Sequence, residues 1–163
     1  TGYPTTTIFL SKSILHLISN PNQLSKLLNN PNLMDSAIEE LLRYRGVMLT
    51  TTRYALEDIH INGKVIKKGD HIALMNASGN HDPKIYKNPM IFDITRKPNK
   101  HLTFGVGQRF CMGANLARME AKVLFDSIFR KFPKLEIIEP PENIKQIASD
   151  APGKLILKAI EIK

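Results

Sequence analysis

The sequence has little that could cross-link it or hold it in a membrane. Its 163 residues include one cysteine, which excludes a disulfide within the chain and fits a reducing compartment such as the cytoplasm. It has no tryptophan, no recognisable signal peptide, and no apolar run near the ~20 residues of a membrane span. We therefore expect a cytoplasmic protein without a membrane segment.

Acidic residues are also scarce, with 15 Asp and Glu against 23 Lys and Arg and a net charge of +8. A basic excess of this kind serves either nucleic acid or an acidic protein partner. The lysines are scattered without a run of four, and no basic patch alternates with aromatic residues. Nucleic-acid binding is therefore not expected, whereas an acidic protein partner remains compatible with the charge.

Apolar spacing predicts three helices within the first 45 residues. The first ends before Pro21, the second lies between Pro21 and Asn30, and the third spans the apolar positions from 33 to 42. From residue 50 the period changes to two, which predicts strands at 51–55, 59–61, 64–66 and 71–75. The Asn62-Gly63 pair is typical of a tight hairpin turn between two of these strands.

The second half of the chain is predicted to hold one long helix. Residues 76–103 are rich in turn signals and indicate an irregular stretch with room for one short helix. Residues 114–132 have helical spacing with one apolar face, and Pro133 ends the helix. The tail predicts short strands at 135–138 and 155–160 around a proline-rich loop. We therefore expect a mainly α fold with small β-sheets and no linker within residues 1–163.

The run from Phe104 to Gly113 is the most informative motif, and it reads F-x-x-G-x-R-x-C-x-G. Its glycines let the backbone approach a flat ligand, and Arg109 is suited to a carboxylate. Cys111 would lie near the N-terminus of the following helix, which favours a thiolate. A lone thiolate without other metal-spaced ligands suits an axial haem ligand better than zinc or an iron–sulfur cluster. Taken without this context, a single cysteine is more often a small buried hydrophobe.

This motif resembles the haem-binding loop of the cytochrome P450 family of haem-thiolate monooxygenases, and the resemblance extends along essentially all 163 residues. It implies the C-terminal part of the cytochrome P450 fold, from the end of the I-helix through the L-helix and the terminal strands. Residues 1–163 would form the haem-ligand half of the domain, with the N-terminal half absent. The implied cofactor is haem b, iron protoporphyrin IX, with Cys111 as its axial metal ligand. The loop residues implied to contact the cofactor are Phe104, Gly105, Gly107 and Gly113.

Glu40 and Arg43 are spaced i, i+3, so that they share one face of the third predicted helix. Such pairs are common on solvated helices. The resemblance matches this one to the E-x-x-R pair of the K-helix, and it matches Arg96 to an arginine that joins the pair beneath the haem. It implies that these three residues support the loop that presents Cys111.

The resemblance also implies partners for the two haem propionates. It matches Arg53 and Arg109 to propionate-binding arginines, and it adds His101 as a possible contributor. Two guanidiniums are chemically suitable because each can hold a carboxylate through two hydrogen bonds. Read alone, Arg53 is an exposed strand arginine and His101 a local hydrogen-bonding residue.

The N-terminal residues resemble the oxygen-binding segment of the I-helix, whose pattern is A-G-x-D/E-T-T. Gly2 would let the helix open beside bound O2, and Thr5 would supply the hydroxyl that guides proton delivery. Without that context, Thr5 is a helix-capping or core threonine. Pro4 departs from the pattern, because it stands where the family has a carboxylate and has no titratable group.

The segment Val47, Met48 and Leu49 matches a part of the family that lines the substrate pocket, although core packing explains these residues equally well. The family implies a monooxygenase that inserts one oxygen atom of O2 into a small apolar substrate, with electrons from a ferredoxin- or flavin-type donor. The open alternatives are a non-catalytic haem-thiolate binder or sensor, an inactive fragment that needs its N-terminal half, and a haem-free structural domain.

Overall fold

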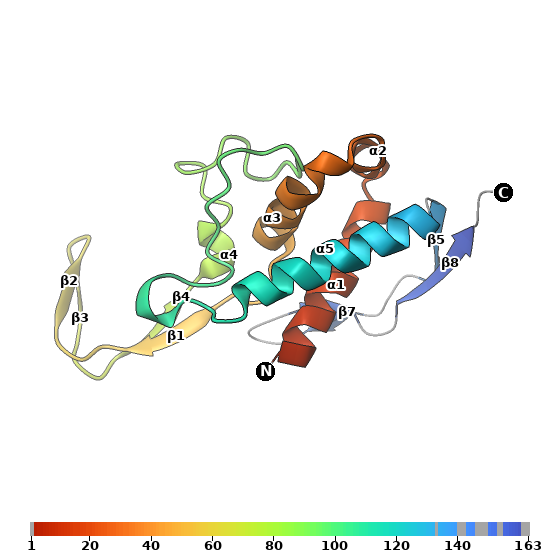
Figure 1. Ribbon diagram of the computed structural model, residues 1–163. Coiled ribbons are helices and arrows are strands. Elements are labelled where there is room, and N and C mark those ends of the chain that lie inside the picture. The colour runs from red at the N-terminus through yellow and green to blue at the C-terminus, as the bar shows by residue number, and fades with distance from the viewer. Residues whose placement is uncertain (1, 133, 140–142, 146–149, 153–154, 161–163) are drawn as a thin grey trace.

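The computed structural model describes residues 2–132, 134–139, 143–145, 150–152 and 155–160. Within them, three long helices form the centre of the molecule: α1 (Gly2–Ile18), α3 (Met34–Arg45) and α5 (Ala114–Lys131). Each of the three contacts the other two, and α5 lies across α1 in Figure 1. The short helix α2 (Pro21–Asn29) joins α1 to α3 through the 3-10 helix η1 (Pro31–Leu33). All three helices predicted in the first 45 residues are therefore present.

Proline and asparagine set the two breaks between these helices. Pro21 and Pro31 each stand in the first turn of the element that follows, where the missing N–H costs nothing. The side chain of Asn30 accepts a hydrogen bond from the backbone N–H of Asn32 at the start of η1. Asn20 precedes α2 without capping it, since its side chain instead donates to the carbonyl of His16 at 2.7 Å.

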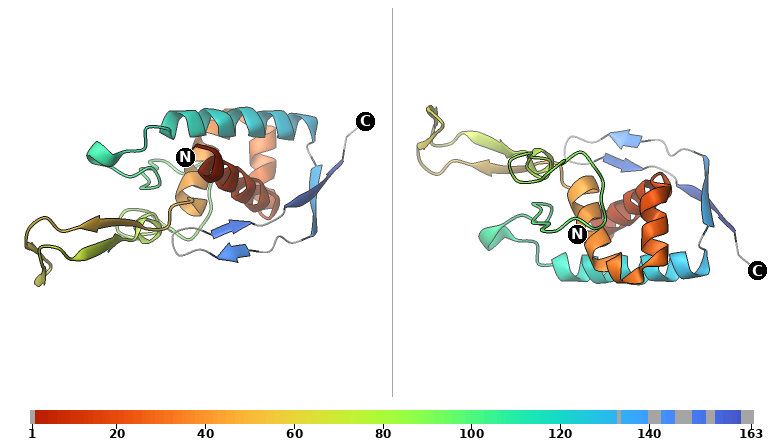
Figure 2. Two further views of the ribbon diagram at one scale, coloured as in Figure 1. Left: turned by 90° about the horizontal axis from the view of Figure 1, so that it is seen from below. Right: turned by 90° about the horizontal axis from the view of Figure 1, so that it is seen from above.

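The strands form two-stranded antiparallel sheets. Strand β1 (Thr51–Tyr54) pairs with β4 (His71–Leu74), and β2 (Ile59–Ile61) pairs with β3 (Lys64–Ile66). Asn62 and Gly63 join β2 to β3 with positive φ angles of 48° and 74°, as the predicted hairpin requires. Together these strands make an arm that extends away from the helices in both views of Figure 2.

The strands formed by residues 134–139 and 156–160 lie at the opposite end of the molecule from this arm (Figures 1 and 2). Strand β5 (Lys134–Glu139) pairs with β8 (Ile156–Ile160), close to the predicted positions. Between them, β6 (Asn143–Lys145) pairs with β7 (Asp150–Pro152), where the sequence predicted only a loop. Each of these two strands has three residues, which is too short to show an alternating pattern in the sequence. Part of the predicted proline-rich loop lies at 140–142, outside the described residues.

The core lies where α1, α3 and α5 meet, and it is closed by the segment around residues 92–94. Its fully buried side chains include Leu17, Leu41, Ile94, Ala121 and Phe125. The irregular stretch contains the short helix α4 (Asn76–Gly79), as the turn signals allowed.

The prediction of one apolar face on α5 was wrong. Ala121, Phe125 and Phe129 are buried, whereas Leu116, Met119 and Val123 are 51%, 59% and 62% exposed. Apolar residues at three- and four-residue intervals occupy two sides of this helix, so α5 has a second apolar stripe that the described residues do not cover.

Candidate functional site

Cys111 lies in a loop whose backbone conformation is fixed by hydrogen bonds. The N–H of Cys111 donates to the carbonyl of Phe104 at 2.8 Å, which ties the two ends of the motif together. Gly105 and Gly107 have φ angles of 72° and 66°, a region that glycine enters without strain. The loop therefore closes into a compact turn, and the side chain of Cys111 is exposed.

The helix that follows the loop places its N-terminus beside this thiol. Helix α5 begins at Ala114, three positions after Cys111, and the N–H of Ala114 donates to the carbonyl of Cys111 at 3.2 Å. The N-terminus of an 18-residue helix carries partial positive charge, which favours an anionic group nearby. This position suits a cysteine that binds a metal, because the sulfur bound to the metal is anionic.

A cavity of about 560 Å³ opens between this loop, α1 and α5. Its volume lies within the roughly 300–1,000 Å³ typical of ligand and cofactor sites. From α1, α3 and the segment after α3 it is lined by Gly2, Tyr3, Thr5, Thr6, Phe9, Leu42, Val47 and Met48. From the loop and α5 it is lined by Thr103, Phe104, Cys111, Met112, Gly113, Leu116, Ala117 and Glu120. The exposed sulfur and the predicted oxygen-binding helix therefore share one cavity.

The cavity gathers about half of the residues that the sequence singled out. Its lining includes seven of the predicted positions: Gly2, Thr5, Val47, Met48, Phe104, Cys111 and Gly113. Six others are not among the described residues that line it: Leu49, Arg53, His101, Gly105, Gly107 and Arg109. The two predicted propionate arginines are exposed, and Arg53 donates to the carbonyl of Thr52 at 2.7 Å.

His101 contacts a carboxylate of α3. Its Nε2 lies 3.2 Å from Oε2 of Glu39, and its Nδ1 accepts from the N–H of Thr103 at 3.3 Å. Glu39 also accepts two hydrogen bonds from Arg118 of α5, one of them to Oε2 at 2.9 Å. Burial alone would raise the pKa of Glu39, but the hydrogen bonds from Arg118 and His101 lower it to about 2. His101 thus belongs to a network that joins this segment to α3 and α5.

Glu40, Arg43 and Arg96 meet in the interior below the loop. Arg43 donates to both carboxylate oxygens of Glu40 at 2.8 Å, and Nε of Arg96 lies 3.1 Å from Oε1 of the same carboxylate. The remaining nitrogens of the two guanidiniums donate to backbone carbonyls of the irregular stretch, including those of Asn80 and Lys87. The cluster therefore anchors residues 80–96 to helix α3.

Asn80 connects this stretch to the residues directly before the Phe104–Gly113 motif, a role that the sequence did not predict. Its side chain accepts from the N–H of Leu102 at 2.7 Å and donates to Oγ1 of Thr103 at 3.2 Å. The hydroxyl of Thr103 in turn donates to the carbonyl of Leu42 at 2.6 Å. No local pattern in the sequence marks these contacts, because each joins residues more than twenty positions apart.

Three cavity-lining residues of α5, Leu116, Ala117 and Glu120, were also missed, although a signal for them exists. Counted from Gly113, which was predicted, they follow the spacing i+3, i+4, i+7 and so continue one side of the helix. Extending this helical spacing from Gly113 along the sequence would have identified the α5 side of the cavity.

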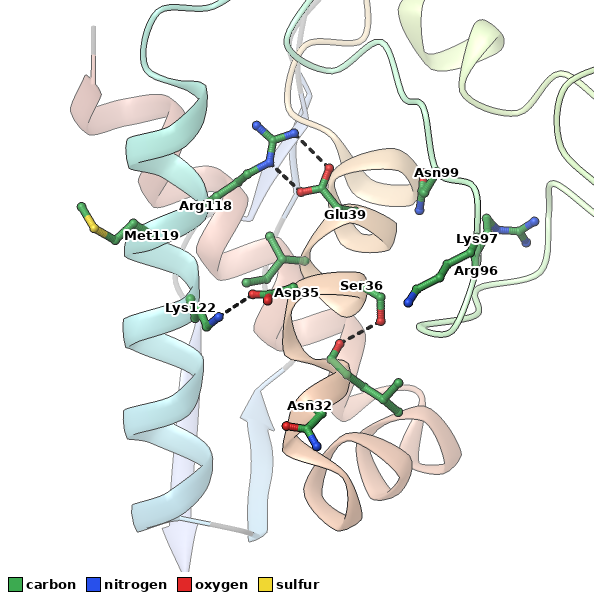
Figure 3. Close-up of a pocket in the computed structure, with 12 residues that line it drawn as sticks. Asn32, Asp35, Ser36, Glu39, Arg96, Lys97, Asn99, Arg118, Met119 and Lys122 are labelled. Carbon is green, nitrogen blue, oxygen red and sulfur yellow. Dashed lines mark hydrogen bonds and ion pairs between the residues drawn. The ribbon is translucent and has the colours of Figure 1, made fainter.

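A second groove, of about 590 Å³, runs between α3, α5 and residues 96–99 (Figure 3). Arg118 and Lys122 of α5 point toward α3, where they bind Glu39 and Asp35, the latter at 2.7 Å. Met119 points away from α3. The charges at the centre of the groove are therefore paired with one another.

The residues around the first cavity fit a haem group. One exposed thiol is present at its wall, and elsewhere the lining is mostly apolar or hydroxyl-bearing. Among the described residues, no group of three or more His, Cys, Asp or Glu side chains could hold a metal ion. A cavity with one cysteine ligand suits a metal whose other ligands come with the cofactor.

None of the helices in the described part of the chain has the length and apolarity needed to cross a membrane.

Comparisons with known proteins agree with this site. Residues 1–157 match the family described as Cytochrome P450. The biotin biosynthesis cytochrome P450 of Bacillus subtilis (strain 168) is 43% identical over 138 residues, which are 85% of this chain and 35% of that protein. The polyketide biosynthesis cytochrome P450 PksS of the same strain is 39% identical, over 88% of this chain and 36% of that protein.

Solved structures show the same fold. P450BioI, crystallised with an acyl carrier protein ligated to hexadec-9Z-enoic acid, superposes with a TM-score of 0.94 and 38% identity, over 98% of this chain and 42% of that chain. CYP109E1 from Bacillus megaterium, in complex with testosterone, gives 0.95 and 32%, over 98% of this chain and 45% of that chain. The chain thus spans little more than a third of the length of the two sequence relatives.

Proposed function

Because this chain belongs to the cytochrome P450 family, we propose that it supplies the haem-thiolate part of a monooxygenase. The reaction places one atom of O2 into a C–H bond of an apolar substrate and releases the other as water, which consumes two electrons and two protons. The observation that carries the proposal is the cavity itself, in which the exposed thiol of Cys111 and the hydroxyl-bearing side of α1 line one space.

Bound haem would supply the redox-active iron at which O2 is reduced. Cys111 would hold that metal through its thiolate, and the N-terminus of α5 would stabilise the negative charge on the sulfur. Phe104 and Gly113 line the same space and would pack against the flat ring. Gly105 and Gly107 would set the course of the turn, since both have positive φ.

The propionate groups of haem need cationic partners, and Arg53 and Arg109 are the ones we propose. Both are exposed outside the cavity lining, so each must turn inward to bind a carboxylate. His101 would contribute only by exchanging its contact with Glu39 for the cofactor.

Thr5 and Gly2 of α1 would form the oxygen side of the site, while Val47 and Met48 would contact the substrate. The substrate class is supported by two relatives, whose solved complexes contain a long-chain acyl group and a steroid. Leu49 lies outside the described cavity lining, and its carbonyl accepts from the N–H of Ala77 at 3.1 Å. We propose it as part of the wall behind that segment.

Other partners follow from the same family. The exposed stripe of Leu116, Met119 and Val123 would pack against the remaining part of a cytochrome P450 domain. Electrons would come from a ferredoxin- or flavin-type donor, whose acidic surface suits the net charge of +8. We infer a cytoplasmic location, where a thiol stays reduced.

Substitution of Cys111 by serine tests the ligand. The haem-loaded protein, expressed with the full reading frame that contains residues 1–163, should show the carbonyl absorption band of a thiolate-ligated haem after reduction under carbon monoxide. Cys111→Ser should abolish that band with little change in helical circular dichroism. Val106→Ser is the matched control, because its side chain is exposed in the same loop but outside the cavity lining, and this variant should keep the band. A Cys111→Ser variant that retains the band contradicts the assignment.

A non-catalytic haem-thiolate binder is the second candidate, and Pro4 is the observation that favours it. The residue occupies the position of the usual carboxylate and can donate no proton. Substrate-dependent consumption of NADPH through a redox partner, with oxygenated product, identifies the enzyme. A thiolate spectrum without turnover identifies the binder.

A further inference from the structure

The guanidinium of Arg118 is held at each of its nitrogens. Nε and Nη2 donate to the two carboxylate oxygens of Glu39 on α3, at 2.6 and 2.9 Å, and Nη1 donates to the carbonyl of Ala114 on its own helix at 3.4 Å. Figure 3 shows the side chain extending from α5 toward α3, with both hydrogen bonds to Glu39 drawn. A planar group bound in this way has a fixed orientation.

Arg118 also contacts the first residue of the cysteine loop. Its Cζ lies over the ring of Phe104, 4.7 Å from the ring centroid. A cation over the face of an aromatic ring is attracted to it, and a flat guanidinium also stacks on that face. Arg118 lines the groove of Figure 3, whereas Phe104 lines the cavity that contains the thiol. The contact therefore joins the wall of the groove to the wall of the cavity.

Phe104 and Ala114 are the two residues that hold the backbone of Cys111. The carbonyl of Phe104 accepts from the N–H of Cys111 at 2.8 Å, and the N–H of Ala114 donates to the carbonyl of Cys111 at 3.2 Å. Arg118 contacts both of them, and its ion pair with Glu39 connects all three to α3. One side chain therefore links the start of the loop, the end of the loop and the neighbouring helix.

We propose that Arg118 is a positioning residue for Cys111: anchored by Glu39, it holds Phe104 and Ala114 in place and thereby fixes where the sulfur lies relative to the metal of the bound cofactor. The inference rests on the haem-thiolate site proposed above.

Lys122 supplies a matched control on the same helix. It forms the other ion pair between α5 and α3 in the groove, with Asp35 at 2.7 Å. In the described part of the chain, no hydrogen bond, ion pair or ring contact joins Lys122 to the cysteine loop. Lys122→Gln therefore weakens the contact between the two helices without touching the residues that hold Cys111.

The first test measures the midpoint reduction potential of the haem in the loaded protein, expressed with the full reading frame that contains residues 1–163. Arg118→Gln and Glu39→Ala should shift this potential in the same direction, because each releases Phe104 and Ala114. Charge alone would shift it in opposite directions, since one variant loses a cation and the other an anion. Lys122→Gln should leave the potential unchanged.

Arg118→Lys separates the shape of the side chain from its charge, and it carries the test if Arg118→Gln does not fold. A single ammonium keeps the charge but cannot bind both oxygens of Glu39, the carbonyl of Ala114 and the ring of Phe104 together. We expect the potential of Arg118→Lys to shift in the same direction as that of Glu39→Ala.

The second test follows the loop directly by hydrogen–deuterium exchange. The N–H of Cys111 exchanges only when its hydrogen bond to Phe104 opens. Exchange within residues 104–114, compared with the buried segment 121–129 of α5 as a reference for global unfolding, should be faster in Arg118→Gln and unchanged in Lys122→Gln.

The outcomes separate this inference from the proposed function. A thiolate-type carbonyl band in the unmodified protein, with potentials that move in opposite directions or stay unchanged in Arg118→Gln and Glu39→Ala, overturns the role of Arg118 and leaves the haem-thiolate site standing. A shift of equal size in Lys122→Gln also overturns it, because any ion pair between α3 and α5 would then suffice. Absence of the band from the unmodified protein overturns both proposals.

Discussion

Glu40 and Arg43 form a fully buried ion pair one helical turn apart on α3, with Nε of Arg43 2.8 Å from Oε2 of Glu40 and Nη2 2.8 Å from Oε1. Two charges taken out of water are tolerated only when their hydrogen-bonding capacity is used. Here Arg43 also donates to the carbonyls of Asn80 and Pro89, while Glu40 accepts from Arg96, Asn99 and the N–H of Asp93. The pair therefore joins helix α3 to the whole irregular stretch.

Removal of one partner from this pair should be severely destabilising. Arg43→Ala leaves the carboxylate of Glu40 buried against fewer donors, and we expect the free energy of unfolding to fall by about 3–5 kcal/mol. Urea unfolding followed by circular dichroism measures the change. Lys67→Ala breaks an ion pair of the same length with Asp58, but both side chains are exposed, so the loss should be much smaller. Equal losses in the two variants would refute the argument.

Gly46 should tolerate no side chain, for steric reasons alone. A Cβ at this position would lie 2.7 Å from the carbonyl oxygen of Leu42 and 2.9 Å from Oγ1 of Thr103, which hydrogen-bond each other. Gly46→Ala should cost about 1–3 kcal/mol and shift Val47, which lines the cavity. Gly63→Ala meets no atom within 4 Å and carries only the strain of positive φ, roughly 1 kcal/mol. A thermal unfolding midpoint for Gly46→Ala equal to that of Gly63→Ala would contradict the clash.

Local patterns predicted the elements well, because the helices are set by apolar spacing and by prolines such as Pro21 and Pro31. The family resemblance was confirmed by the comparisons, and the structure brings Cys111 and Thr5 to one cavity. The roles of the site residues remain predictions. The two-sided apolar surface of α5 could not be predicted, since it depends on which segments meet in space. Strands β6 and β7 were missed because three residues are too few to show an alternating pattern.

His16 should make stability depend on pH in the mildly acidic range. Burial, and then the neighbouring charge of Arg45, lower the pKa of His16 from 6.5 to about 4. His16 therefore takes up a proton near pH 6.5 in the unfolded chain but only near pH 4 in the folded protein. Its contribution to stability is complete above pH 6.5 and is lost progressively as the pH falls from 6.5 to 4.

Replacement of that imidazole should remove this part of the pH dependence. His16→Phe keeps a ring against Phe92 and Tyr44, whose centroids lie 4.5 and 5.1 Å away. The slope of unfolding free energy against pH between 4 and 6.5 should decrease, as measured by urea unfolding at several pH values. His60→Asn changes an exposed histidine of β2 and should leave the slope unaltered. An undiminished slope in His16→Phe would exclude the assignment.

The contact between Arg118 and Glu39 should govern stability at lower pH. Hydrogen bonds from Arg118 and His101 outweigh burial and hold the pKa of Glu39 at about 2, below its ordinary 4.5. A depressed carboxyl pKa stabilises the protein above pH 4.5, and that contribution is lost as the pH falls toward 2. Arg118→Gln brings the pKa of Glu39 back toward its ordinary value, so the loss of stability between pH 4.5 and 2 should shrink.

At pH 7 the Arg118→Gln variant should be less stable than the unmodified protein by about 1–2 kcal/mol. The effect is modest because the paired side chains are 31% and 29% exposed and solvent screens their charges. Arg130→Gln removes the exposed partner of Asp126 on the same helix and should change neither quantity measurably. If Arg118→Gln shows the same acid dependence as the unmodified protein, the hydrogen bonds from Arg118 do not hold the pKa of Glu39 down.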